Sequence, residues 1–111
     1  MQIFDDMQTL ERSLDVRAQR NEVLASNLAN VDTPNFTPQD IDFDDAMQSL
    51  TGEVEQKDDA SLGVAGFDGN RVDLDKTMAA LGENGMQYDA AARVIEKKLA
   101  IVRYVASDGQ G

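Results

Sequence analysis

The sequence predicts an all-α protein in which two long amphipathic helices, one at each end, form an antiparallel, coiled-coil-like hairpin joined by a flexible acidic middle segment. Apolar residues recur at three- and four-residue steps at both ends, which places them on one side of a helix. Both prolines, Pro34 and Pro38, lie between these ends. With 41% apolar and 5% aromatic residues among 111, the chain is expected to need stabilisation beyond its own core.

The first predicted helix occupies residues 1–31 and carries a regular stripe from Met7 to Val31. Its apolar positions are Met7, Leu10, Leu14, Leu24, Leu28 and Val31. Arg17 and Asn21 interrupt the stripe, and two hypotheses remain open for them. They are buried with partners and set the helix register, or they lie at its solvated edge. The helix is expected to end before Pro34, because proline disfavours the α conformation of the preceding residue.

The middle segment, residues 32–73, carries most of the charge. Its eleven acidic and two basic residues contribute −9 of the net −11. Apolar residues at Phe43, Met47, Leu50 and Val54 indicate a short helix near residues 42–51. From Thr51 to Val72 a mobile loop is expected, and the Asp68-Gly69-Asn70 turn leaves open a small hairpin within it.

The second long helix is predicted over residues 74–107, with Asp73 as its N-cap and residues 108–111 as a tail. Its seam comprises Leu74, Met78, Leu81, Gly85, Tyr88, Ala92, Ile95, Leu99, Val102 and Ala106. Val94, Ile101 and Val105 form a second apolar row, so the helix presents a wider face than one partner covers. This row packs on further neighbours or, alternatively, on the middle segment of the same chain.

Composition argues against several classes of function. The chain has no His or Cys, and its carboxylates lie in a solvated stretch, so no catalytic, cofactor-binding or metal-binding residues are predicted. Asp40, Asp42 and Asp44 suggest the start of a calcium loop, but Asp45 stands where that loop needs Gly and Thr51 where it needs Glu. The net charge of −11 disfavours nucleic acid, and no apolar run approaches the roughly 20 residues of a membrane span.

A short motif follows the first helix. Asn27, Leu28, Ala29, Asn30, Thr33 and Pro34 match the pattern Asn-hydrophobic-Ala-Asn, two variable residues, then Thr-Pro-Gly-Tyr. This resembles the N-terminal signature of the flagellar rod, hook and hook-associated axial proteins. Asn35 and Phe36 replace the Gly and Tyr; Asn tolerates the left-handed conformation and Phe keeps the ring. The flanking residues 17–20 and 40–43 and the short chain are most similar to rod members, and Asn84–Tyr88 matches the family more weakly.

The resemblance implies a structural subunit of the bacterial flagellar basal-body (proximal) rod, made in the cytoplasm and exported unfolded through the flagellar type III apparatus. Export without a cleaved signal agrees with Asp5 and Asp6, which stand where a secretory signal would be basic or apolar. The expected partners are the chain itself, other flagellar rod proteins, and inner-membrane ring and export-gate components of the basal body. No nucleic acid and no small-molecule substrate are expected.

The subunit is expected to polymerise through its terminal helices and to transmit torque. The predicted assembly seam is Met7, Leu10, Leu14, Leu24, Leu28, Leu81, Tyr88, Ile95, Leu99 and Val102. An alternative function is an acidic helical adaptor or secretion chaperone that binds a partner helix, and an enzyme is a distant third. Presence in purified basal bodies, as opposed to a one-to-one soluble complex with a client, distinguishes the first two.

Overall fold

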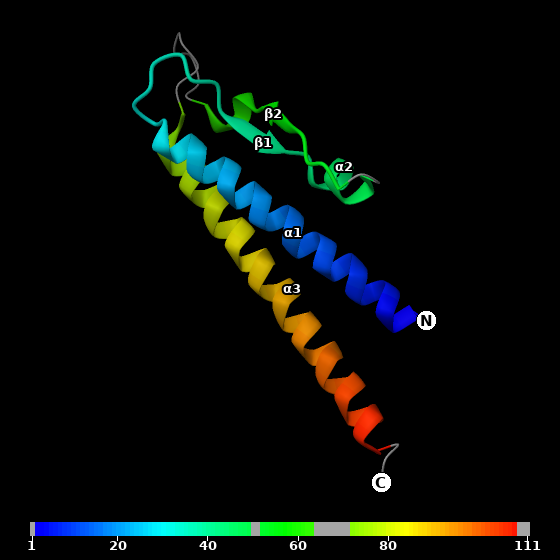
Figure 1. Ribbon diagram of the computed structural model, residues 1–111. Helices are drawn as coiled ribbons and strands as arrows, with labels where there is room; N and C mark the ends of the chain where they lie inside the picture. The colour runs from blue at the N-terminus through cyan, green and yellow to red at the C-terminus, as the bar shows by residue number, and fades with distance from the viewer. Residues whose placement is uncertain (1, 50–51, 64–71, 109–111) are drawn as a thin grey trace.

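The structure is a computed structural model that describes residues 2–49, 52–63 and 72–108. Its elements in chain order are α1 (Gln2–Ala29), β1 (Gln39–Ile41), α2 (Phe43–Gln48), β2 (Gln56–Asp58), the 3-10 helix η1 (Ala60–Leu62) and α3 (Leu74–Asp108). The molecule is elongated, with principal extents of 68 × 26 × 17 Å. The two long helices α1 and α3 account for most of that length (Figure 1).

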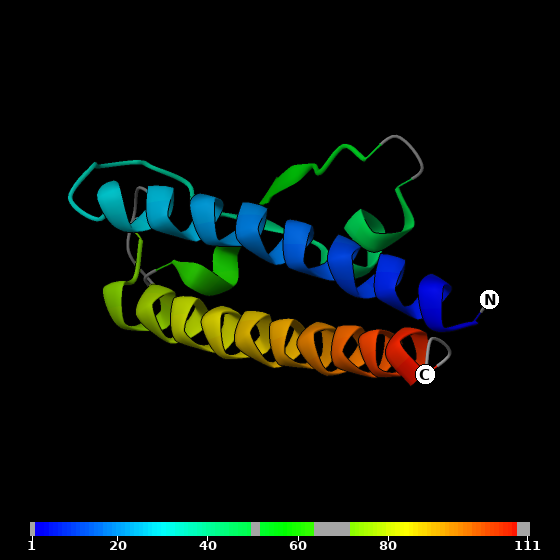
Figure 2. The same cartoon turned by 60° about the horizontal axis from the view of Figure 1, so that its bottom comes forward.

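α1 and α3 lie side by side and run in opposite directions (Figures 1 and 2). Near the N-terminus, Lys98 Nζ lies 3.7 Å from Asp6 Oδ2. Further along α1, Asn84 Nδ2 donates a hydrogen bond of 2.8 Å to the backbone oxygen of Arg17. Residue numbers therefore rise on one helix as they fall on the other. The predicted fold class, an all-α hairpin of two long terminal helices, is confirmed.

The predicted seam residues are buried to very different degrees. Met7 and Leu24 are buried, whereas Tyr88 is 39% exposed. The partly buried members are Leu10, Leu14, Leu28, Leu81, Ile95, Leu99 and Val102. Among the residues of α3 whose burial is described, 74–107, the buried side chains are the polar Thr77 and Asn84, and no apolar side chain is buried. The hairpin therefore leaves much of the apolar surface of α3 uncovered.

The strand β1 and the helix α2 of the middle segment pack against α1 (Figure 1). Val16 and Val23 of α1 form a buried cluster with Ile41 of β1 and Ala46 of α2. The side chains that pack against this cluster are Phe43, Met47 and Val54. α1 thus buries apolar residues on two sides, which explains why Val16 and Val23 are buried although they lie off the predicted seam.

β1 and β2 form a two-stranded antiparallel sheet in which Gln39 pairs with Asp58 and Ile41 with Gln56. The sequence predicted a loop for this part of the chain, and that prediction is wrong for Gln56–Asp58. Each strand has three residues. Such short strands cannot show the alternation of apolar and polar residues by which strands are predicted, and their pairing depends on contacts far apart in the sequence.

Aspartate side chains cap the N-termini of α2 and α3. Asp42 Oδ1 accepts a hydrogen bond of 3.1 Å from the backbone nitrogen of Asp45 at the start of α2. Asp73 Oδ1 accepts one of 3.0 Å from the backbone nitrogen of Lys76, which confirms the predicted N-cap of α3. Side-chain oxygens at this position satisfy backbone N–H groups that have no partner within the helix.

Three features considered in the sequence fall outside the described residues: Leu50, the Asp68-Gly69-Asn70 turn and the last residues of the tail, 109–111. The described chain ends within α3, at Asp108. Within the described ranges, no helix is both long and apolar enough to cross a membrane.

The Leu24→Ala variant is expected to lose roughly 2–5 kcal/mol of unfolding free energy, because the side chain is fully buried and its removal leaves a cavity. The measurement is urea unfolding of the purified chain, followed by circular dichroism. Val105→Ala is the matched control: Val105 is 63% exposed, so its effect is expected to stay within about 0.5 kcal/mol. Equal losses in the two variants would contradict the placement of Leu24 in the core.

Candidate assembly interface

Asn27 is buried and connects the end of α1 to β1. Its Nδ2 donates to the backbone oxygen of Gln39 over 2.7 Å, and its Oδ1 accepts from the backbone nitrogen of Gln39 over 3.0 Å. The amide thereby satisfies both main-chain groups of one residue. A side chain with one donor and one acceptor in this geometry is required, which explains the need for Asn at this position of the motif.

Asn30 and Thr33 close the turn that follows α1. The Asn30 side chain donates to the backbone oxygen of Ser26 over 2.9 Å. Thr33 donates to Asn30 twice, from its backbone nitrogen to the backbone oxygen over 3.0 Å and from Oγ1 to Oδ1 over 3.1 Å. These bonds satisfy groups that the end of a helix leaves without partners, so they determine where α1 ends.

Asn35 adopts the left-handed conformation, with φ of +64°. This is the backbone geometry that the Gly of the family pattern adopts readily and that Asn tolerates better than most residues. Of the other motif positions, Leu28 and Phe36 are partly buried, whereas Ala29 and Pro34 are exposed. The motif therefore builds a turn that redirects the chain along α1.

Arg20 and Asp40 reinforce this turn with a two-bonded ion pair. Arg20 Nε lies 2.9 Å from Asp40 Oδ1, and Nη2 lies 3.0 Å from Oδ2. The pKa of Arg20 is raised above its ordinary value, chiefly by the hydrogen bond to Asp40 and against the opposing effect of burial. Sequence reasoning singled out neither residue for such a role. The two lie twenty positions apart, and no local pattern marks them as partners.

Arg17 and Asn21, the polar residues that interrupt the first seam, lie in different environments. Arg17 donates to Gln87 Oε1 of α3 over 2.6 Å, and its guanidinium lies 4.2 Å from the centre of the Phe43 ring of α2. Burial, followed by the nearby charge of Arg20, lowers the pKa of Arg17. Asn21 is exposed. Arg17 therefore has partners on α2 and α3, as the first hypothesis requires, but it is only partly buried, and Asn21 lies at the solvated edge.

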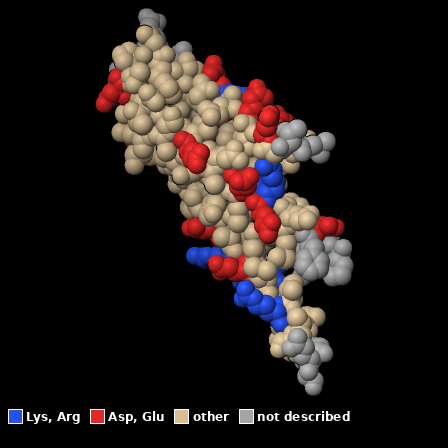
Figure 3. Space-filling view, in the orientation of Figure 1, with Lys and Arg blue, Asp and Glu red and all other residues tan. Residues whose placement is uncertain are grey.

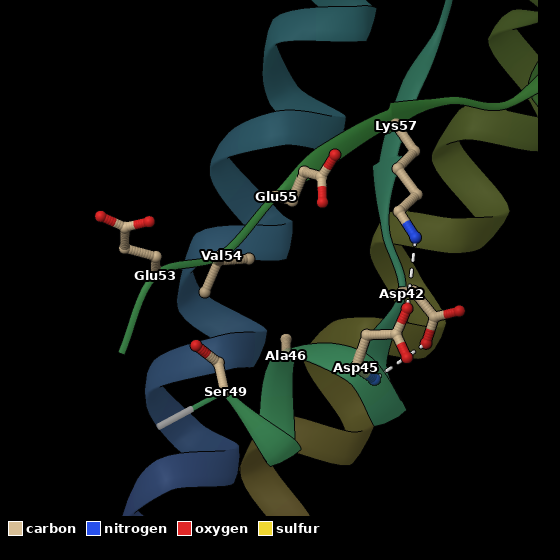
Figure 4. A pocket seen from close by; sticks show the side chains of 8 residues that line it. All are labelled: Asp42, Asp45, Ala46, Ser49, Glu53, Val54, Glu55 and Lys57. Atoms are coloured by element: carbon tan, nitrogen blue, oxygen red, sulfur yellow. Dashed lines mark hydrogen bonds and ion pairs between the residues drawn. The ribbon is translucent and has the colours of Figure 1, made fainter. Parts of the chain in front are cut away.

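The acidic residues near α2 line a shallow cavity of about 400 Å³ (Figure 4). Asp42 caps α2, and Asp45 Oδ2 lies 3.2 Å from Lys57 Nζ across the cavity (Figure 4). Asp40 is held by Arg20. Three of the four aspartates in the cluster thus have structural partners. In the part of the chain that the structure describes, no group of three or more acidic side chains is arranged to hold a metal ion.

One face of α3 exposes several apolar side chains to solvent. Ile101 is 56% exposed and Val94 is 41% exposed. The other members, Met86, Tyr104 and Val105, are each at least 63% exposed. The alternative that Val94, Ile101 and Val105 pack on the middle segment is therefore wrong, because β1 and α2 pack on α1 instead. We call Met86, Val94, Ile101, Tyr104 and Val105 the exposed α3 row.

The chain is similar in sequence to known proteins along most of its length. A family model described as Flagella basal body rod protein matches residues 7–37, which span most of α1 and the whole turn. Similar proteins include the flagellar basal body rod protein FlgB of Yersinia enterocolitica and that of Escherichia coli (strain K12). Each is 27% identical, with 89% of this chain and 91% of the relative aligned. FlgB of Bacillus subtilis (strain 168) is 24% identical, over 94% of this chain and 95% of the relative.

A helical hairpin with an uncovered face and a motif that serves to build a turn defines a structural subunit. The chain belongs to the flagellar basal-body rod protein family, as the sequence motif predicted. It is a structural subunit of the rod in the flagellar basal body and not an enzyme.

The left-handed Asn35 provides a test of the turn. Asn35→Val is expected to lower the unfolding free energy by about 1–2 kcal/mol, because a β-branched residue is strained at positive φ. Asn35→Gly should match or exceed the unchanged protein in stability, since Gly adopts this conformation freely. Thermal unfolding of both variants measures the difference. If the Val and Gly variants were equally stable, residue 35 would not be held in this conformation.

Proposed function

We propose that the subunit joins its neighbours in the rod through the exposed α3 row, while the α1–α3 hairpin acts as its stiff axial element. The observation that carries this is the uncovered row itself. Ile101 and Tyr104, near its C-terminal end, are 56% and 71% exposed, and Val94 precedes Ile101 by about two helical turns. Burying such surface contributes about 25 cal/mol per Å². Patches of this kind mark protein–protein contacts.

The neighbours are further copies of the chain and other flagellar rod proteins. The position of the middle segment supports this, because it covers α1 and leaves α3 accessible along its C-terminal half. Side-by-side helices joined through apolar rows resist bending and twisting together, so a rod of such subunits transmits torque. The predicted seam, with Leu24, Leu28, Ile95, Leu99 and Val102 at its centre, then holds the hairpin itself together.

The proposal also includes the route to the rod. The chain is exported unfolded through the flagellar type III apparatus, and it assembles near the inner-membrane ring and the export gate. Among its described residues, α3 buries no apolar side chain, so the hairpin has a small hydrophobic core. A small core gives a low free energy of unfolding. The adaptor alternative is not favoured, because the relatives that cover about nine-tenths of the chain are rod proteins.

Ile101→Asp is expected to prevent rod assembly and motility without unfolding the monomer, because it places a charge in the row but in no intramolecular core. Swimming of cells that carry only this variant, and its presence in purified basal bodies, provide the measurement. Ala100→Asp is the control, since Ala100 is exposed but lies about 100° around the helix from Ile101. Normal swimming with Ile101→Asp would exclude the row as an interface.

Leu99→Asp is also expected to stop assembly, but for a different reason. Leu99 is partly buried, so a charge there should destabilise the hairpin itself. Circular dichroism of the purified variants distinguishes the two cases: Leu99→Asp should lower the unfolding temperature, and Ile101→Asp should leave it unchanged. An unchanged unfolding temperature for Leu99→Asp would show that Leu99 does not contribute to the packing between α1 and α3.

A further inference from the structure

A groove of about 470 Å³ lies between α1 and α3, with residues of both helices in its walls. Ala18 and Glu22 contribute from α1, and Asn84, Gly85, Tyr88 and Asp89 from α3. The groove is separate from the exposed α3 row, because the row residues do not line it. It is also separate from the acidic cavity of Figure 4, whose lining comes from the middle segment.

Asn84 lacks one hydrogen bond in this groove. The residue is 1% exposed, and its Oδ1 accepts no hydrogen bond from any described residue. The amide cannot be turned to remove the problem, because Nδ2 donates to the Arg17 backbone oxygen, which can only accept. A buried acceptor without a partner costs free energy. The groove therefore favours an occupant that brings a hydrogen-bond donor.

The surroundings of Asn84 favour a cationic donor on a narrow, partly apolar stem. Glu22 and Asp89 are exposed carboxylates that line the groove, together with Tyr88. Arg17 also lines it, but its guanidinium is held by Gln87 and the Phe43 ring. A Cβ added to Gly85 would meet no atom within 4 Å, so there is open space over the backbone there. A lysine side chain has these properties: three donors, a positive charge and a flexible methylene stem.

Lys97 is such a side chain on the chain itself. It is exposed, and it forms no ion pair with any described residue. It lies within the exposed α3 row, one turn after Val94 and one turn before Ile101. Residues 90–107 carry four basic residues and one acidic residue within a chain of net charge −11. On the face shown in Figure 3, most Lys and Arg side chains lie toward that end of the molecule.

We propose that Lys97 of one subunit enters the α1–α3 groove of a second copy, where its ammonium donates to Asn84 Oδ1 between Glu22 and Asp89. This rests on the proposed function and specifies one of its contacts. Asn84 and Lys97 are thirteen positions apart on α3, so two copies running in the same direction are offset by about 20 Å along the helix. Lysine and groove are different surfaces, so the contact is heterologous and can continue from copy to copy.

Filling the groove tests this contact. Gly85→Leu is expected to weaken self-association by about tenfold or more, because its side chain takes the space of the lysine stem. Gly82→Leu is the matched control: the position is also in α3 and equally open, but it does not line the groove. Both changes favour the helix, so neither should unfold the monomer. Sedimentation velocity over a range of concentrations gives the association constants.

Charge reversal provides the second arm. The single variant Lys97→Glu and the double variant Glu22→Lys/Asp89→Lys are first measured separately. Each should self-associate about tenfold more weakly than the unchanged chain, because like charges then meet. An equimolar mixture of the two variants should recover association, since each supplies the charge that the other needs. Lys76→Glu, which reverses a lysine outside the exposed α3 row, should not be rescued by the groove variant.

The outcomes separate this contact from the proposed function. If Ile101→Asp abolishes association while Gly85→Leu and Lys97→Glu do not, the exposed row is an interface and the groove contact is wrong. Failure of the charge-reversed mixture to recover association overturns the pairing of Lys97 with the groove. If the unchanged chain does not self-associate at any concentration, a second copy is not the occupant, and self-assembly through the row fails with it.

Discussion

The paired hydrogen bonds between the Asn27 amide and the main chain of Gln39 decide where the rest of the chain lies. They hold the chain at the end of α1 and send β1 and α2 back along that helix. The Arg20–Asp40 ion pair strengthens the same return. Because β1 and α2 then bury Val16 and Val23 of α1, they are not available to cover α3. The buried Asn27 amide thus affects which surface of α3 stays exposed.

The distribution of apolar burial connects the monomer with the rod. α1 is packed from two sides, whereas α3 buries the polar Thr77 and Asn84 and no apolar side chain among its described residues. A subunit of this kind keeps a recognisable fold but retains apolar area whose burial favours association. The same thin core suits a chain that has to be unfolded for export, because little intramolecular free energy opposes unfolding.

Charge has a different task in each part of the molecule. In the middle segment, carboxylates cap α2 and pair with Arg20 and Lys57, so they stabilise local structure. In the C-terminal half of α3, exposed basic residues stand among apolar ones without partners in the described chain. Complementary charges on two different surfaces of one subunit give the assembly a direction. The basic surface of each copy then faces the acidic surface of the next copy.

The two long helices, the Asp73 cap and the family motif could be predicted from the sequence alone, because these depend on neighbours within about four positions. The β1–β2 pairing, the Asn27–Gln39 and Arg20–Asp40 contacts and the uncovered row of α3 could not be predicted in this way, because they depend on how distant parts of the chain pack. The pairings join residues at least twelve positions apart, and strands of three residues carry no readable period. Apolar spacing shows that a helix has a face to bury, but which partner covers it depends on where the rest of the chain packs.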